Sequence, residues 1–398
     1  MSAEFSGVPI AFHRKPLENW SWLPRIIPVK TLSNSIAHIS ETYIQKRRIK
    51  ALVAAAVEFG RKHKVDRVWA VLQGQTNIRL ALAVADELKV PLHSHVWDVF
   101  NWWIKANGID PLTAQSTQLL FNDAIQKSAS VAAASRPMAD EYHQRFGVKA
   151  IPILSSLPKA MARSPDIAIG NTLTIGMAGQ FYAANEWHEL VKRLDAALWT
   201  VAGRPVRIIA MGSKPPPSGV SGKVTFLGWK SQNDAIDILS GCDFLYCPYP
   251  FDPSMEDVSR YSFPSKLVLY LAAGRPVIFH GPEFSPPAKY IAQKECGVVV
   301  ADLAAQGILS EIERLSQDSA IYQRMATAAQ RSFVNDFTLE AMAHDFRDFI
   351  GAAREDAVDP QDHTLGDGDV PQIDHLVWTR RGLASLIFRW LKSRRPAL

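Results

Sequence analysis

The sequence predicts an α/β fold with two Rossmann-like domains that face each other across a cleft. Three observations predict it. Short apolar stretches alternate with longer amphipathic ones along most of the chain, which is typical of parallel sheets wound by helices. The alternation lapses once and then restarts, and 398 residues suffice for two domains with separate cores. Ligands of such sheets bind at the carboxyl ends of the strands.

The N-terminal domain, residues 1–156, is expected to open with a helix over residues 36–63, where apolar residues recur at helical spacing. Four strands and three helices then alternate. The strands are predicted at 67–72, 91–96, 129–134 and 148–153, and the helices between them at 77–89, 115–127 and 136–146.

Residues 157–171 are predicted to form a hinge, because the periodicity is lost there and the segment holds two prolines. The C-terminal domain, residues 172–353, then repeats the alternating pattern. Its strands are predicted at 172–178, 206–211, 223–227, 243–247, 276–279 and 297–300. Its helices are predicted at 186–199, 231–240, directly after Pro264, and at 286–293, 302–316, 318–333 and 338–353.

Two further segments follow the second domain. Residues 354–375 are rich in acids, proline and glycine, which predicts a solvated linker. Residues 376–398 end in LVWTRRGLASLIFRWLKSRRPAL, in which apolar residues share one helical face and the only charges are basic. That pattern is typical of an interfacial helix on an anionic membrane. A terminal helix docked on the protein itself is the alternative.

The composition limits the class of protein. A hydrophobic content of 47% is that of a globular chain, and no apolar run reaches the roughly 18 residues that a transmembrane helix needs. The three cysteines, an odd number in apolar contexts, predict reduced core residues of a cytosolic protein. We therefore expect a cytoplasmic protein that associates peripherally with the inner membrane face.

Two ligand classes are not expected. The net charge of +5 is modest and concentrates in the tail without an RNA-reading motif, so we expect no nucleic acid partner. The segment QGQTN at residues 73–77 lacks the GxGxxG pattern of NAD enzymes.

One stretch, SFPSKLVLYLAAGRPVIFHGP at residues 262–282, predicts a binding site for an anion. Ser262 is a candidate cap for a helix whose first turn holds Pro264, where a missing N–H costs nothing. The free N–H groups of that turn, the Ser265 hydroxyl and the Lys266 ammonium together suit a phosphate-sized anion. The helix is expected to end at Gly274 in a left-handed conformation.

This stretch and three others resemble, in order, the donor-binding domain of GT-B glycosyltransferases, in particular the retaining enzymes of family 4 (glycosyl transferases group 1). The other three are TIGMAGQFYAANEWHELV (174–191), VRIIAMGSK (206–214) and VTFLGWKSQNDAIDILSGCDFLYCPY (224–249). In the N-terminal half, residues 90–100 and 128–147 are similar more weakly to the acceptor domain of that family.

The resemblance implies a site for a nucleotide-sugar donor, UDP- or GDP-linked. A glycine loop would approach the diphosphate, a tryptophan would lie beside the base, and the helix after Pro264 would stabilise the leaving diphosphate in place of a metal ion. No metal or other cofactor is expected. The implied donor-binding residues are Gly179, Gln180, Gly212, Gly228, Trp229, Arg260, Ser262, Ser265 and Lys266.

The sequence departs from the family in its carboxylates. Family 4 enzymes usually carry two glutamates eight positions apart, the second of which binds the donor ribose. Tyr261 and Leu269 occupy those positions here. Leucine cannot accept a hydrogen bond from a ribose hydroxyl, so the contact is made differently or is missing. Glu256 and Asp257, in the loop expected before Ser262, are possible substitutes.

A second departure lies at the front of the chain. A GT-B acceptor domain ordinarily begins with a strand and a glycine-rich turn, and SAEFSGVPIAFHRKPLENWSWLPRIIPVK supplies no such unit. We expect the N-terminal domain to lack its first strand–helix unit. Either the coding start lies upstream, or the acceptor domain is reduced.

Acceptor-side candidates come from the strand before residue 98. His93, His95 and Trp97 alternate onto one face, and Asp98 follows at the carboxyl end. His95, Asp98 and Lys266 are therefore the candidate catalytic residues. A retaining transfer needs no protein base if the departing phosphate accepts the proton of the acceptor.

These features favour a metal-independent, hexosyltransferase-type enzyme of polysaccharide biosynthesis. It would move a sugar, with retention, to a lipid-linked or polysaccharide acceptor. Two alternatives stay open. One is a nucleotide-sugar epimerase, which needs acid and base groups in its cleft. The other is a GT-B remnant without catalysis that serves as a binding or assembly subunit.

Overall fold

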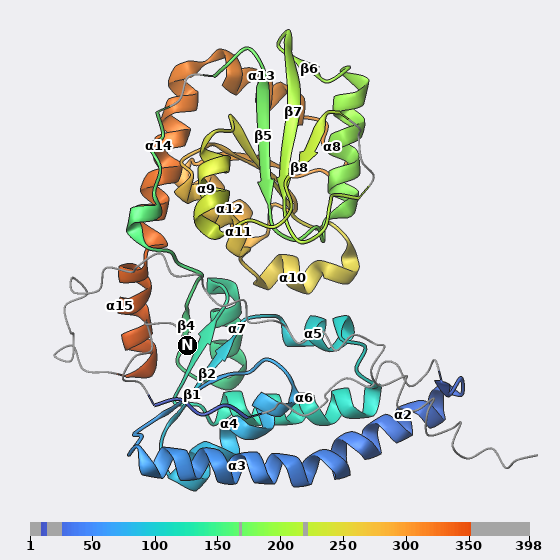
Figure 1. Cartoon of the computed structure of the whole chain (residues 1–398), viewed down its shortest axis with the longest axis vertical. Coiled ribbons are helices and arrows are strands. Elements are labelled where there is room, and N and C mark those ends of the chain that lie inside the picture. Colours follow the sequence, from blue (N-terminus) through green and yellow to red (C-terminus); the bar gives the residue numbers. More distant parts are fainter. Residues whose placement is uncertain (1–8, 14–25, 167–168, 218–221, 352–398) are drawn as a thin grey trace, which may run out of the picture. The chain divides into compact units, whose positions relative to one another are not determined.

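The computed structural model describes residues 9–13, 26–166, 169–217 and 222–351. Within them lie two separate parallel sheets, each flanked by helices, which confirms the predicted α/β class (Figure 1). The predicted linker 354–375 and basic tail 376–398 lie outside the described residues.

The N-terminal sheet contains four parallel strands in sequential order. They are β1 (Val68–Val71), β2 (Leu92–Val96), β3 (Ser130–Ala133) and β4 (Ala150–Pro152). One face is covered by α4 (Gln75–Leu88), α6 (Pro111–Gln126) and α7 (Arg136–Phe146), whose apolar residues share a core with Val131 and Ala133. Between those two residues, Ala132 faces the other way and contacts Phe349 of α15 (Leu339–Ile350). The alternation of β3 therefore separates two helical layers.

The predicted helix over residues 36–63 is longer and interrupted. It consists of α2 (Lys30–Ile39), a π-turn η2 (Ser40–Ile44) and α3 (Gln45–Lys62), which follow each other without a gap. The prediction started late because residues 30–35, KTLSNS, are mostly polar and carry little apolar periodicity. The short helix α5 (Phe100–Ala106) was not predicted.

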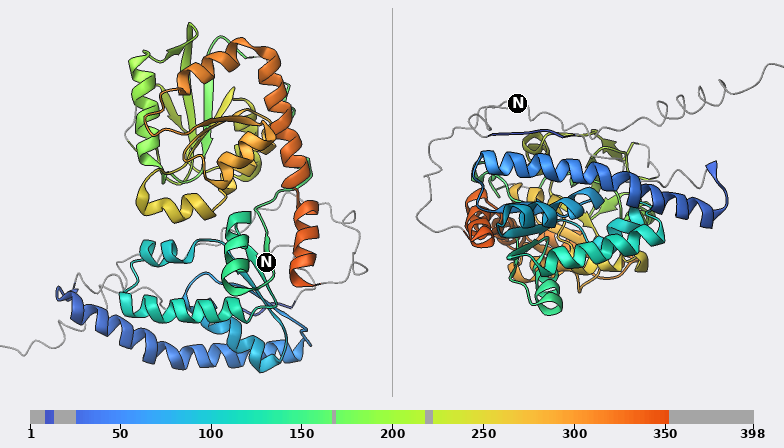
Figure 2. Two further views of the ribbon diagram at one scale, coloured as in Figure 1. Left: turned by 180° about the vertical axis from the view of Figure 1, so that it is seen from behind. Right: turned by 90° about the horizontal axis from the view of Figure 1, so that it is seen from below.

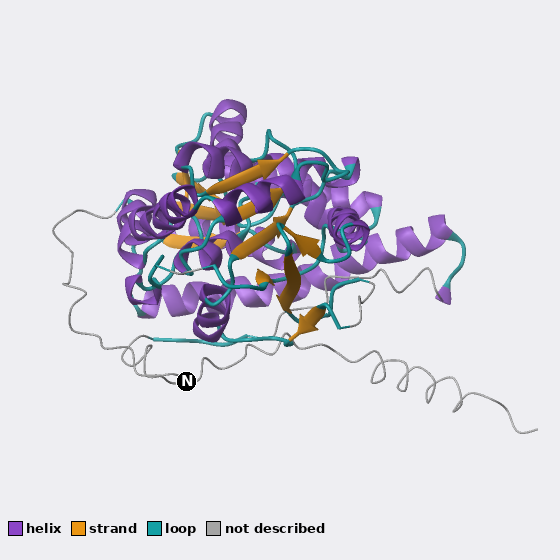
Figure 3. Ribbon diagram, turned by 90° about the horizontal axis from the view of Figure 1, so that it is seen from above, coloured by secondary structure: helices purple, strands orange, loops and turns teal. Residues whose placement is uncertain are grey.

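The C-terminal sheet has the strand order β11-β10-β9-β5-β7-β6, with β8 paired to β7. Figure 3 shows its strands sandwiched between helices. The strands are β5 (Leu173–Ala178), β6 (Thr200–Val201), β7 (Arg204–Met211), β8 (Val224–Phe226), β9 (Phe244–Pro248), β10 (Val277–His280) and β11 (Gly297–Val300). All pairs are parallel except the β6–β7 hairpin.

The helices of this sheet form two layers. On one face lie α9 (Gln232–Ser240), α11 (Ser265–Ala272), α12 (Pro286–Lys294) and α14 (Ser319–Asp336), and on the other α8 (Ala184–Ala196) and α13 (Ile308–Gln317). Strand β10 shows the division, because Val277 and Phe279 join the first core while Ile278 joins the second. Short 3-10 turns lie at η3 (Lys159–Met161) and η4 (Pro253–Met255).

Three predicted boundaries of this domain are wrong. Helix α8 stops at Ala196, because Leu198 and Trp199 have positive φ values of 50° and 54° and lead into the hairpin. Helix α13 starts at Ile308 and not at residue 302. The Asp302 carboxylate accepts a hydrogen bond from the backbone N–H of Gln306, which stabilises a turn before the helix. The loop predicted around Glu256 is the helix α10 (Glu256–Tyr261).

Helix α15 follows α14 directly but packs on the N-terminal sheet, as Figures 1 and 2 show. Arg67 donates to the carbonyl of Ile350 at 2.8 Å, and the Ser130 hydroxyl donates to the carbonyl of Phe349 at 2.5 Å. An isolated bridge between Leu157 and Thr338 joins the two crossing segments. Residues 339–350 thus return to the first sheet of the chain.

Candidate active site

Three glycines follow neighbouring strands of the C-terminal sheet, and main-chain hydrogen bonds join the loops in which they lie. Gly179 follows β5, Gly212 follows β7, and Gly228 lies two residues after β8. The N–H of Gly179 donates to the carbonyl of Met211 at 3.0 Å, and the N–H of Gly212 donates to the carbonyl of Gly228 at 3.0 Å. The loops therefore form one layer at the carboxyl edge of the sheet, where ligands of such sheets bind.

Each of these positions needs glycine for a physical reason. Gly179 and Gly228 have φ values of +102° and +71°, which residues with a Cβ rarely adopt. At Gly212 a Cβ would lie 2.5 Å from the carbonyl oxygen of Gly179, a backbone atom that cannot move aside cheaply. Glycine at residue 212 thus lets the two loops pack closely, whereas Gly179 and Gly228 are partly exposed and leave bare backbone that a ligand can approach.

Lys266 lies directly against the first of these loops. It is the second residue of α11, and a Cβ added to Gly179 would lie 3.6 Å from its Cβ and its Cδ. Its side chain is 7% exposed. The Nζ donates to the carbonyl of Pro248 at 3.2 Å and lies 4.7 Å from the centre of the Tyr182 ring. The lysine stem thus lies against the glycine loop, and its ammonium lies between the end of β9 and an aromatic ring.

Tyr270 fixes α11 in this position. Its hydroxyl accepts the N–H of Ala178 at 2.8 Å and is 3.2 Å from the carbonyl of Tyr246. It lies one helical turn after Lys266, so the bond to the last residue of β5 sets how α11 meets the glycine loop. The predicted apolar face of this helix, which includes Leu267 and Leu271, is fully buried.

The electrostatics of Lys266 favour an anion. Among the described residues, no carboxylate forms an ion pair with it. Burial lowers the pKa of its ammonium below the usual value, because the charged form loses solvation. A buried cation without a counter-ion is costly, and a multiply charged anion against the glycine loop would relieve that cost.

The predicted start of α11 is wrong in one respect. Ser262 does not cap it: Ser262 follows α10, and its carbonyl accepts a hydrogen bond from the Tyr249 hydroxyl at 2.9 Å. Pro264 is the N-cap residue rather than a residue of the first turn, and no side chain caps the helix. Gly274 has the predicted left-handed conformation, with φ at +66°.

The other predicted donor residues are more open. Gln180 and Ser265 are exposed, and Trp229 is exposed next to Gly228. Arg260 does not point freely into solvent: it donates to Glu256 at 2.7 Å, and its guanidinium lies 4.6 Å from the centre of the Phe284 ring. The structure brings Gly179, Gly212, Gly228 and Lys266 together by direct contacts and hydrogen bonds.

Neither position of the missing glutamates offers a replacement carboxylate. Leu269 belongs to α11 and packs against the core, and the carbonyl of Tyr261 accepts the Ser135 hydroxyl at 2.6 Å. Sequence reasoning missed the buried acid of this region, Glu186, which accepts the N–H of Phe251 at 2.8 Å. No sequence signal marked it, because an acid in the first turn of a helix is ordinarily solvated.

Sequence reasoning also missed Tyr182, three residues after Gly179. Its ring faces Lys266 and lies 6.1 Å from that of Tyr249 in an edge-on arrangement. An aromatic residue close behind the predicted glycine loop was the available signal, but spacing alone does not say which way the loop directs a side chain.

The acceptor-side candidates belong to the N-terminal sheet. His95 is 7% exposed, and its ring contacts those of Trp69, Trp97 and Phe349. Burial lowers its pKa to about 4, and in the described residues its Nδ1 has no hydrogen-bond partner. It is therefore a neutral histidine among aromatic rings.

Asp98 lies after the end of β2 and accepts a hydrogen bond from the Gln73 amide at 2.9 Å. Burial raises its pKa above the usual range. Gln73 follows β1, so the pair joins the carboxyl ends of two adjacent strands. The structure shows no hydrogen bond between Asp98 and His95, whose ring instead packs with the aromatic residues of β1 and α15.

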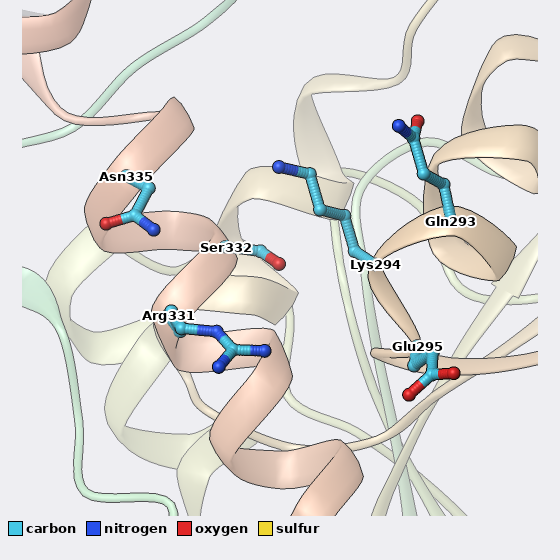
Figure 4. A pocket seen from close by; sticks show the side chains of 6 residues that line it. All are labelled: Gln293, Lys294, Glu295, Arg331, Ser332 and Asn335. Carbon is cyan, nitrogen blue, oxygen red and sulfur yellow. The ribbon is translucent and has the colours of Figure 1, made fainter.

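A separate pocket of about 260 Å³ lies at the opposite edge of the C-terminal sheet (Figure 4). It opens between the end of α12 and α14, just before β11 begins, and is therefore not part of the glycine layer. Its lining is polar and consists of Gln293, Lys294, Glu295, Arg331, Ser332 and Asn335. Lys294 also pairs with Asp336 at 2.6 Å.

The described residues contain no cluster of metal ligands. No group of three or more histidine, cysteine or acidic side chains there is arranged to hold a metal ion. None of the described helices combines the length and the apolar character that crossing a membrane requires.

Comparisons with known proteins agree with this architecture. The family described as "Glucosyltransferase 3-like, C-terminal domain" matches residues 193–335. Among the curated proteins, no sequence matches the chain. Solved structures, in contrast, match over most of its length.

A sucrose-phosphate synthase from Thermosynechococcus elongatus is 13% identical with a TM-score of 0.57, over 77% of this chain and 79% of the other. HepE from Anabaena, solved in complex with UDP, is 16% identical with a TM-score of 0.57, over 76% and 82%. A glycosyltransferase from Rickettsia africae is 13% identical with a TM-score of 0.56, over 77% and 82%. The chain has the GT-B fold, and these similarities support a GT-B glycosyltransferase.

Proposed function

We propose that the chain transfers a sugar from a nucleotide-diphosphate donor, with retention, to a lipid-linked or polysaccharide acceptor. The matched C-terminal domain and the GT-B fold support the reaction class. HepE, which has the same fold, was solved with UDP-glucose and with UDP. This supports a donor linked to uridine diphosphate rather than to guanosine diphosphate.

One observation carries the proposal: the Lys266 stem lies against the bare backbone of Gly179, and its buried ammonium has no counter-ion among the described residues. The donor diphosphate is the anion that suits this place. Its oxygens would accept hydrogen bonds from main-chain N–H groups of the first turn of α11 and of the residues after Gly179, since the N–H of Gly179 itself bonds to Met211. Ser265, exposed at that turn, would add its hydroxyl.

The same arrangement explains catalysis. The bond between the anomeric carbon and the diphosphate oxygen breaks, and negative charge develops on that oxygen. Lys266 and the positive end of α11 stabilise this charge most strongly when it is fully developed, which lowers the barrier. The acceptor hydroxyl attacks on the face that the diphosphate leaves, and its proton passes to the departing oxygen. His95 and Asp98 would then position the acceptor rather than serve as its base.

The ribose contact must differ from that of family 4 enzymes. Leu269 offers no acceptor atom, and Glu256 is already paired with Arg260. Asp257, the second residue of α10, is therefore the remaining candidate for the ribose contact. Association with an anionic membrane through residues 376–398 remains part of the proposal.

Calorimetric titration with UDP, GDP and UDP-glucose tests the donor site. Lys266→Met should weaken UDP binding roughly tenfold to a hundredfold, because a hydrogen bond to a charged group is lost. Lys223→Met is the matched control, since Lys223 is exposed at the start of β8, at the other edge of the sheet. Equal loss in both variants, or no binding of any nucleotide to the wild type, would contradict the proposal.

The absence of carboxylates at residues 261 and 269 also favours a second candidate, a GT-B remnant that binds without catalysis. Labelled UDP-glucose separates the two. Release or transfer of the sugar, lost in Lys266→Met, supports the enzyme, whereas tight nucleotide binding with no turnover supports the remnant. An epimerase would instead change the configuration of the nucleotide-bound sugar and leave the donor bond intact.

A further inference from the structure

The first helix of the described chain carries an exposed apolar stripe. Val29, Leu32, Ile39 and Tyr43 are all solvent-exposed, Leu32 to 51% and Tyr43 to 70%. They recur at steps of three, seven and four residues along α2 and its π-turn, so they lie along one side of the helix. The buried Ser33 and Ala37 line a different side of α2, away from Leu32 and Ile39. We call these four residues the α2 stripe.

The position of α2 keeps the stripe accessible. His38 bonds to Thr113 at 3.2 Å, which anchors α2 to the first turn of α6. Figures 1 and 2 both show α2 as the outer end of the long helix it forms with α3. Next to the anchor, Leu112 of α6 is exposed as well. Contiguous exposed apolar residues on a soluble lobe mark an interaction surface.

The charge next to the stripe is almost purely positive. Arg47 stands four residues after Tyr43, and the exposed cations of this segment are Lys30, Lys46, Arg47, Arg48 and Lys50. The one acid between residues 26 and 50, Glu41, is buried and paired with Arg79 at 2.8 Å. An apolar stripe bordered by cations that have no ion-pair partner among the described residues is complementary to one kind of surface, a bilayer with anionic headgroups.

We infer that the α2 stripe is a membrane-docking site, in which the four apolar residues enter the interfacial layer of an anionic bilayer while Lys46, Arg47 and Arg48 contact its headgroups. This site is distinct from the tail 376–398 and does not depend on the proposed glycosyl transfer. It would hold the N-terminal sheet at the membrane whether or not a donor is bound.

A fluorescent label at residue 39 tests the inference directly. The three native cysteines are buried and unpaired, so a new surface cysteine is the selective labelling site. The full-length Ile39→Cys variant, labelled with an environment-sensitive dye, is mixed with phosphatidylcholine vesicles that contain phosphatidylglycerol. We expect a blue shift of the emission and quenching by a lipid-borne quencher. Vesicles of phosphatidylcholine alone should produce neither.

Leu198→Cys is the matched control, because Leu198 is an exposed leucine at the hairpin of the other sheet. Its label should stay unquenched on the same vesicles. In the Ile39→Cys protein, replacing Arg47 and Arg48 by alanine should lower the partition coefficient roughly fivefold per residue, since each basic side chain contributes about that factor near an anionic surface.

Three results would overturn the inference. The protein could fail to bind anionic vesicles at all. It could bind them, through the tail, while the label at residue 39 stays unquenched. The label could also shift without lipid as the protein concentration rises, which would identify the stripe as a contact between copies. Calorimetric titration with UDP reads the donor site separately, so none of these outcomes bears on the proposed transferase activity.

Discussion

At the scale of single residues, the candidate site depends on two groups that are absent, a side chain at residue 212 and a carboxylate beside Lys266. Gly212 has no Cβ because the carbonyl of Gly179 occupies that space. Lys266 has no carboxylate partner among the described residues, so its charge remains available to a ligand. The sequence analysis named Gly179, Gly212 and Lys266 as candidates for one site, but only the structure shows that the lysine stem runs against the glycine loop.

His95 gives the fold a specific pH dependence. Its pKa is lowered to about 4 by burial, whereas in the unfolded chain it should be near 6.5. Between about pH 6.5 and pH 4, His95 is protonated in the unfolded chain but stays neutral in the folded protein. Stability is therefore lost across that window, by up to about 3 kcal/mol for this residue.

Urea unfolding at pH 7.5 and pH 4.5 checks this expectation. The wild type should lose more stability between the two pH values than His95→Leu, which has no proton to bind. Comparing the two proteins cancels the contributions of other titrating groups, including His93 and His280, whose pKa values burial also lowers. An identical loss in both proteins would show that His95 does not titrate as its surroundings imply.

At the scale of elements, Arg275 joins parts that are distant in the sequence. It is buried and follows Gly274, at the end of α11. Its guanidinium donates to the carbonyls of Gly274 and Ser164 at 2.8 and 2.9 Å, and to that of Ser240 at the end of α9. A cation at the carboxyl ends of two helices is stabilised by their dipoles. The hinge segment around Ser164 is held by the same side chain.

We expect Arg275→Met to lower the free energy of unfolding by about 2–4 kcal/mol, because it leaves several buried carbonyls without donors. Arg145→Met is the control: Arg145 is exposed, with a 4.0 Å pair to Glu141 and its guanidinium 4.9 Å from the centre of the Phe146 ring, and its loss should cost less than about 1 kcal/mol. Urea unfolding followed by circular dichroism measures both. Equal stability of the two variants would mean that water replaces the guanidinium without cost.

Elements were predictable where burial sets their pattern. The apolar face of α11 and the left-handed Gly274 follow from residue spacing and were predicted. The start of α11 was not, since the Ser262 carbonyl bonds to Tyr249 from a different strand and Pro264 takes the N-cap position. Local capping preferences could not anticipate that competition. The helix α10 was missed because its six residues are too few to show periodicity.

At the scale of the molecule, the two sheets were predictable and their connection through α15 was not. Alternating strands and helices identify each sheet, and the sheets match GT-B structures over most of the chain. The periodicity of residues 338–353 marks an apolar helix face, but it does not say which sheet that face covers. Phe349 packs against Ala132 of the first sheet because the chain crosses back after α14.

This crossing makes the stability of the N-terminal sheet depend on α15. Phe349 is fully buried, its ring lies against those of His93 and His95, and its carbonyl accepts the Ser130 hydroxyl. Removing its ring should cost about 3–5 kcal/mol, because the cavity opens in a small core with few other apolar residues.

Hydrogen exchange measured by mass spectrometry shows which strands lose stability when the Phe349 ring is removed. In Phe349→Ala, peptides from β1 to β4 should exchange markedly faster, while peptides from β5 to β11 should keep their protection, since their core does not include this residue. Phe284→Ala, at a half-exposed phenylalanine outside the N-terminal sheet, should leave both sets unchanged. Uniform acceleration in both sheets would instead mean that they unfold as one unit, with α15 transmitting the loss from the first sheet to the second.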